Sequence, residues 1–199
     1  MKKFRDKLKK YAELTEVGEI ARRYFVMNAF DGALTTLGII IGFFLAGAST
    51  SDDVRILVIT VLATALAMGI SGIWGAYLAE RAERKRELQQ LERSMMTDLS
   101  DSVIARATRF AVILSAVVDG ISPALAAVVG ILPFFFGLAG GDFVVLFYIS
   151  IGMNLGILFL LGMFLGRVSK ENVLIMGIKV ILAGVVVTVI LFIVNLIAM

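Results

Sequence analysis

The fold of this chain is decided by the stretch NAFDGALTTLG, residues 28–38. It opens an apolar run that continues to about Gly47 and is long enough to cross a bilayer. Asp31 lies ~12 Å beyond Arg23, the last basic residue before the run, because a helix rises ~1.5 Å per residue. An ionisable side chain at that depth costs at least ~2.5 kcal/mol in hydrocarbon. Asp31 is therefore a candidate for a functional site, since a chain that keeps such a group usually uses it.

The composition indicates an integral membrane protein. The chain has 199 residues, of which 59% are hydrophobic, and a mean hydropathy of +0.95, which leaves too little polar surface for a soluble domain. Its net charge of +3 is confined to particular loops and does not indicate nucleic-acid binding. Cys and His are both absent, so carboxylate, thioether, amide and backbone oxygen are the groups left to bind a metal ion. No resident cofactor is expected.

An all-α fold with five transmembrane helices is predicted. The spans are expected near residues 25–48, 54–79, 110–138, 143–166 and 174–198. Most of the basic residues precede the first span, lie between Arg81 and Arg109, or separate the last two spans. By the positive-inside rule, this distribution places the N-terminus in the cytoplasm and the C-terminus outside. The apolar run of the first span is too long for a signal peptide, so we expect that span to be retained.

Two parts of the chain are expected, residues 1–23 and the five-span domain 24–199. The first has apolar side chains at spacings of three and four together with many lysines, which is typical of an amphipathic helix on the membrane surface. These apolar residues are Phe4, Leu8, Tyr11, Leu14, Val17 and Ile20. The second includes a cytoplasmic helical arm at 80–109, which continues the second span.

The arm has two interpretations. It is either a solvated helical hairpin held by ion pairs at i,i+3 and i,i+4, or a surface that attracts a cation at the mouth of a pathway. The second interpretation assigns Glu80, Glu83 and Glu87 to one helix face, with Met95 and Met96 nearby.

An internal repeat is suggested by a second Asp-Gly pair, Asp119-Gly120, inside the third span. Small residues align spans 1 and 2 with spans 3 and 4 in the same direction, which indicates a parallel repeat about an axis along the membrane normal. The repeat would put Asp31 and Asp119 at equivalent depths, with Met68 and Met153 near mid-membrane. Each has a structural alternative: close helix packing for the small residues, apolar filling for the methionines.

Three segments resemble signatures of the vacuolar iron transporter family. FDGALTTLG at residues 30–38 is similar to its first-span Asn-Asp-Gly-hydrophobic-x-Thr/Ser-Thr segment. Residues 68–69 and 75–80 resemble its second-span Ser-Met-Gly-x-Gly-Glu-Tyr-x-Ser region, and GILPF at 130–134 resembles Gly…Leu-Pro-Phe of its third span. Five spans with the N-terminus inside also agree, so the resemblance covers essentially the whole chain.

This resemblance implies a homodimer in a prokaryotic cell membrane that exports Fe²⁺, and often Mn²⁺, from the cytosol in exchange for protons. It implies that Asp31 lines the pathway between the subunits, and that the family's pathway Met corresponds to Met68, or to Gly72 when Tyr77 is the anchor. Asn28, from the same stretch as Asp31, completes the candidate metal ligands. The family's larger cytosolic metal-binding domain is reduced here to the arm, and Ala76 replaces its second-span Glu, as expected of a short prokaryotic relative.

The residues permit the implied chemistry. Two Asp31 carboxylates from paired subunits would neutralise a divalent ion, and a thioether would favour Fe²⁺ or Mn²⁺ over Mg²⁺. The same carboxylates could bind protons once the metal leaves. Two other functions stay open: a transporter of another cation and a non-transporting membrane scaffold. An aspartyl protease is disfavoured because the Gly-x-Gly-Asp context is missing, and no enzyme is expected.

Overall fold

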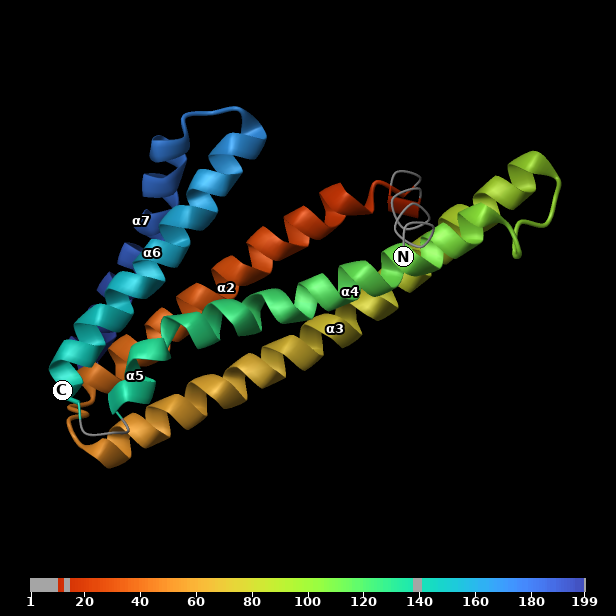
Figure 1. The fold of residues 1–199 in the computed structure, drawn as a ribbon. Helices are drawn as coiled ribbons and strands as arrows, with labels where there is room; N and C mark the ends of the chain where they lie inside the picture. Colours follow the sequence, from red (N-terminus) through yellow and green to blue (C-terminus); the bar gives the residue numbers. More distant parts are fainter. Residues whose placement is uncertain (1–10, 13–14, 138–140, 199) are drawn as a thin grey trace. The chain divides into compact units, whose positions relative to one another are not determined.

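The computed structural model describes residues 11–12, 15–137 and 141–198; residues 1–10, 13–14, 138–140 and 199 lie outside this description. All regular structure in the described part is helical (Figure 1). In chain order the helices are α2 (Val17–Leu45), α3 (Ser51–Met95), α4 (Val103–Gly130), α5 (Leu132–Gly137), α6 (Phe143–Ser169) and α7 (Val173–Ala198). All except the short α5 are long and apolar enough to cross a membrane. The prediction of a five-span, all-α integral membrane protein is confirmed.

The first helix begins inside the segment expected to lie on the membrane surface. Glu16 has a positive φ of 51°, a conformation uncommon for a residue other than glycine, and α2 starts directly after it. Residues 17–23 therefore form the first turns of α2, which runs unbroken to Leu45. Residues 1–10 and 13–14 of the expected surface helix, which include Phe4, Leu8 and Leu14, lie outside the described residues, whereas Tyr11 is described and buried.

The third span is interrupted, where the sequence predicts one helix over 110–138. α4 ends at Gly130, Ile131 forms a turn, and α5 begins at Leu132. Pro133 follows in the first turn of α5, where its missing N–H leaves no helical hydrogen bond unmade. The interruption therefore coincides with the Gly-Ile-Leu-Pro sequence.

The structure divides into two compact units, which are described separately. Unit 1 comprises Met1–Phe25 and Gly69–Ile121, and unit 2 comprises Val26–Met68 and Ser122–Met199. Unit 1 thus holds the start of α2, the arm and most of α4. Unit 2 holds most of α2, the start of α3, the end of α4, and α5 to α7.

Unit 2 has an apolar core and a tight helical hairpin. Its largest fully buried side chains are Phe134, Leu37, Ile40, Ile41, Leu57, Ile131 and Leu158. α6 and α7 lie side by side (Figure 1), and a Cβ on Gly162 would lie only 2.7 Å from the Cα of Gly177 on the facing helix. The glycines here allow close backbone approach, which is the structural alternative that the small-residue pattern leaves open.

Asn154 anchors the end of α4 to α6. Its Nδ2 donates to the carbonyl oxygen of Gly130 at 3.1 Å and to that of Ser150 at 2.8 Å. The Ser150 hydroxyl donates to the same Gly130 oxygen at 2.6 Å. A helix that stops inside a bilayer leaves carbonyl groups without donors, and these two α6 side chains supply them.

Candidate functional site

Asp31 lies at the centre of α2 and on its uncovered side. It is the middle residue of this 29-residue helix, and its side chain is exposed in the single chain. The next residue, Gly32, is buried against the backbone of α4, which lies so close that a Cβ on Gly32 would overlap the carbonyl oxygen of Pro123. Successive helical residues point about 100° apart. The contact that buries Gly32 therefore leaves Asp31 on a face of α2 that the chain itself does not cover.

Asp31 belongs to a polar stripe on α2, formed by Asn28, Asp31, Thr35 and Gly38. Spacings of three and four residues put these positions on one side of the helix. Asn28, Thr35 and Gly38 are partly exposed. The polar stripe therefore gives a membrane span one surface rich in oxygen atoms and small side chains.

Asp119 is held in a close crossing of α3 and α4 in unit 1. A Cβ on Gly72 would lie 2.9 Å from the carboxylate oxygen Oδ2 of Asp119, and also 2.9 Å from the Cα of Gly120. A Cβ on Gly120 would in turn overlap the carbonyl oxygen of Gly69. The Asp119 carboxylate thus rests on the backbone of α3 at a position where a side chain would displace it.

Both Asp-Gly pairs place their glycine at a helix crossing. Gly32 packs against α4 and Gly120 packs against α3. The two aspartates differ, however, because Asp31 is exposed and Asp119 is partly buried. Their environments are therefore different even though their sequence contexts match.

Glu80 is held by a network at the base of the arm. The Tyr24 hydroxyl donates to Glu80 Oε1 at 3.0 Å, and Arg84 Nε lies 3.5 Å from Glu80 Oε2. The Glu80 and Arg84 side chains are only 13% and 15% exposed. Arg84 also reaches Glu87 Oε2 at 3.2 Å and donates to the carbonyl oxygen of Thr15 at 3.4 Å. Glu80 and Arg84 together therefore join the start of α2, the arm and Thr15, which precedes α2, within unit 1.

Two comparisons with known proteins place the chain in a family. It is 35% identical over 181 residues to the uncharacterized protein MJ0645 of Methanocaldococcus jannaschii, which covers 89% of this chain and 90% of the relative. Residues 22–107 match the family model described as the VIT family. The chain belongs to the VIT family. The matched region includes the polar stripe and the arm up to Ala107, and excludes Asp119 and Met153.

Membership of the VIT family makes this protein a membrane transporter of metal ions. Its five apolar helices and its archaeal relative fit a multi-pass protein of a prokaryotic membrane. The resemblance found in the sequence is thereby confirmed.

The arm of this VIT protein holds its predicted acidic residues in different ways. Glu80 and Glu87 pair with Arg84, as the hairpin interpretation expects, whereas Glu83 is exposed. Within the residues that the structure describes, no three Asp, Glu, His or Cys side chains are grouped so that they could hold a metal ion.

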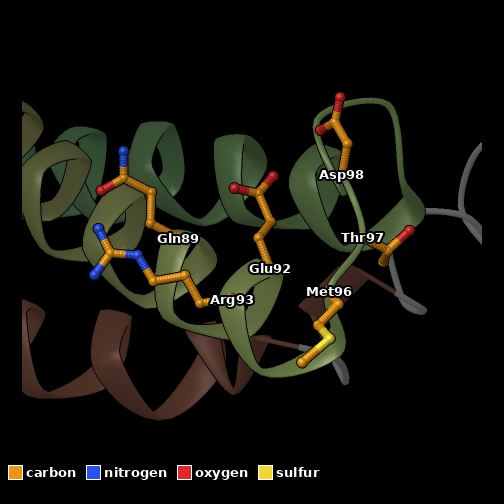
Figure 2. Close-up of a pocket in the computed structure, with 6 residues that line it drawn as sticks. All are labelled: Gln89, Glu92, Arg93, Met96, Thr97 and Asp98. Atoms are coloured by element: carbon orange, nitrogen blue, oxygen red, sulfur yellow. The ribbon is translucent and has the colours of Figure 1, made fainter.

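The end of the arm forms a surface pocket of about 440 Å³. It is lined by Gln89, Glu92, Arg93, Met96, Thr97 and Asp98 (Figure 2). Figure 2 shows the carboxylates of Glu92 and Asp98 on one side of the turn and the Met96 side chain on the other. Glu92 accepts from the backbone N–H of Leu99, and Asp98 accepts from that of Ser100. This second hydrogen bond lowers the pKa of Asp98. These carboxylates stabilise the turn between α3 and α4.

The predicted thioether ligands of the VIT protein lie in unit 2. Met68 is on α3 and Met153 is on α6, and both are partly buried. The next residue, Asn154, is fully buried, and its side chain bonds to the backbone of α4 and α6.

Sequence reasoning missed two polar residues of unit 1, Tyr24 and Ser115. Ser115 is fully buried, and its hydroxyl has no hydrogen-bond partner in the described structure. It precedes Asp119 by four residues, and that spacing is a signal the sequence contains. Tyr24 precedes the first span and carries no comparable signal, because only the fold shows that it reaches Glu80.

Proposed function

We propose that this protein exports Fe²⁺ or Mn²⁺ from the cytosol in exchange for protons, through a pathway between two copies of the chain. The observation that carries the proposal is the place of Asp31, which is central in an apolar helix and exposed in the single chain. A carboxylate left against hydrocarbon is costly. A second copy packed on the polar stripe would cover it and bring two such groups together.

The chemistry of this surface suits a divalent ion. Two Asp31 carboxylates would balance its charge, while Asn28 and Thr35 offer neutral oxygen atoms on the same side of α2. Met68 and Met153 are proposed to add thioether sulfur, which favours Fe²⁺ and Mn²⁺ over Mg²⁺. The arm and the N-terminus would face the cytosol, since they carry most of the basic residues.

The test is metal uptake into proteoliposomes under an imposed proton gradient. We expect Fe²⁺, kept reduced, and Mn²⁺ to enter with the wild type and to fall to background with Asp31→Asn, which keeps the size of the side chain and removes its charge. Asp101→Asn is the matched control, because Asp101 lies exposed in the turn after α3. This control should transport like the wild type.

The alternatives predict other results. A transporter of another cation would move Mg²⁺ or a monovalent ion and leave Fe²⁺ and Mn²⁺ outside. A scaffold would move no ion in any variant. Wild-type metal uptake by Asp31→Asn would contradict the role proposed for this carboxylate.

A further inference from the structure

The interface between α3 and α4 in unit 1 holds a second group of polar side chains. The two helices run in opposite directions here, since Gly72 lies against Asp119 while Arg84 and Ala107 line the same cavity of about 300 Å³ further along the arm. One turn from Gly72 toward the arm is Ala76, and one turn further is Glu80. One turn from Asp119 in the same direction is Ser115.

Ser115 on α4 carries a buried hydroxyl group that the helix packing does not explain. Its side chain is fully buried and its hydroxyl oxygen has no hydrogen-bond partner in the part of the chain that the structure describes. A buried hydroxyl without a partner costs about 1–3 kcal/mol, and a helical serine could satisfy itself by bonding to the carbonyl four residues earlier. A hydroxyl kept in this state one helical turn from Asp119, on the side toward the arm, indicates a place for a water molecule or a proton.

Tyr24 links this interface to the arm. Its hydroxyl donates to Glu80, and the charges of both Glu80 and Asp119 act on it. Two basic groups also lie near this pair: the Arg23 guanidinium is 5.9 Å from the centre of the Tyr24 ring, and Arg84 pairs with Glu80. Unit 1 therefore holds, in order toward the arm, Asp119, then Ser115 one helical turn further, then the hydrogen-bonded pair of Tyr24 and Glu80.

We propose that Asp119 carries the exchanged proton, and that the proton leaves it toward the arm along Ser115, Tyr24 and Glu80, inside one protomer. The inference rests on the proposed function, and it assigns the proton to a carboxylate other than Asp31. Sequence reasoning grouped Asp119 with the metal ligands. Its place against the α3 backbone, beside a buried hydroxyl, suits a proton better than a divalent ion, which needs several oxygen ligands.

The transfer is balanced at each step. An O–H bond breaks on Asp119, and each hydroxyl accepts one proton while it gives up its own, so neither Ser115 nor Tyr24 keeps a charge. Glu80 takes up the proton, which weakens its pairing with Arg84, and then releases it to solvent at the arm. Asp119 and Ser115 are one helical turn apart, which is ~5.4 Å. A single water molecule spans that distance with two hydrogen bonds of about 2.8 Å.

The test follows metal and protons together. Proteoliposomes loaded with a pH-sensitive dye, and a matched set loaded with a Mn²⁺-quenched dye, receive external Mn²⁺ at several pH values. The wild type should exchange Mn²⁺ for protons, with uptake that depends on pH. Asp119→Asn should still admit Mn²⁺ down its own gradient, but without proton movement and without pH dependence. Asp101→Asn should behave like the wild type.

Two further variants keep the test decisive if Asp119→Asn does not fold. Ser115→Ala and Tyr24→Phe each remove one hydroxyl, and each should slow proton movement more than Mn²⁺ uptake. An unchanged ratio of protons to Mn²⁺ in Asp119→Asn, or in both hydroxyl variants, would overturn the proton route alone. A wild type that moves no metal would contradict the proposed function, and the proton route with it.

Discussion

The Asp119 carboxylate occupies the space that a side chain on Gly72 would need. Its Oδ2 lies 2.9 Å from the position of a Cβ on that glycine, and the Cα of Gly120 is equally close. The glycine on α3 thus fixes where the acid on α4 can sit. A methionine at position 72, where one alignment to the VIT family would put it, could not be accommodated in this packing.

Gly72→Ala should therefore disturb both packing and transport. The added methyl group must push α4 away or turn Asp119, and overpacking of this kind typically costs about 1–3 kcal/mol. We expect a lower melting temperature in detergent and slower Mn²⁺ uptake. Gly75→Ala is the matched control, because nothing lies within 4 Å of its Cβ position. It should be neutral or gain up to about 1 kcal/mol from helix propensity. Equal effects of the two substitutions would show that the crossing is looser than described.

The polar stripe can be tested as an interface between copies. The chain contains no cysteine, so Thr35→Cys introduces a single thiol on the same side of α2 as Asp31. Oxidation in membranes should then give a covalent dimer on a non-reducing gel. Leu182→Cys, on an exposed position of α7, is the control and should remain monomeric. Cross-linking through position 182 but not 35 would place the interface on α7 instead.

Glu80 and Glu83 should differ in their effect on stability. Glu80→Gln weakens the pairing with the largely buried Arg84, and a hydrogen bond to a charged group is worth about 1.5–3 kcal/mol. Glu83→Gln changes an exposed side chain and should stay within about 0.5 kcal/mol of the wild type. Thermal unfolding in detergent measures both. If instead Glu83→Gln lowered metal uptake as much as Glu80→Gln, the cation-attracting interpretation of the arm would be favoured.

Asn154→Ala should destabilise unit 2. The substitution removes one of the two side chains that donate to the Gly130 carbonyl oxygen and leaves a cavity in a fully buried position. We expect a loss of about 2–4 kcal/mol, seen as a lower melting temperature. Asn195→Ala on α7, where the side chain is partly exposed, should have little effect. A wild-type melting temperature for Asn154→Ala would mean that Ser150 alone satisfies the end of α4.

The sequence predicts the membrane spans well and the site only in part. Long apolar runs fix the spans, because hydrocarbon admits few other structures. Gly130 and Pro133 are signals for a break in the third span, but the length of the apolar run favours one uninterrupted helix. Asp31 could be found from its cost in the bilayer, whereas the pairing of Tyr24 with Glu80 joins residues far apart in the chain. Only tertiary structure brings such a pair together.

The anchoring of α4 by α6 has a consequence for the evolution of this chain. A Cβ on Gly130 would overlap the amide of Asn154, and the hydroxyl of Ser150 shares the same carbonyl acceptor. A substitution at any one of these three positions should therefore destabilise the protein unless the other two change with it. In related sequences, positions 130, 150 and 154 should be inherited as a set, and a lineage that loses the asparagine should also tolerate a larger residue in place of the glycine.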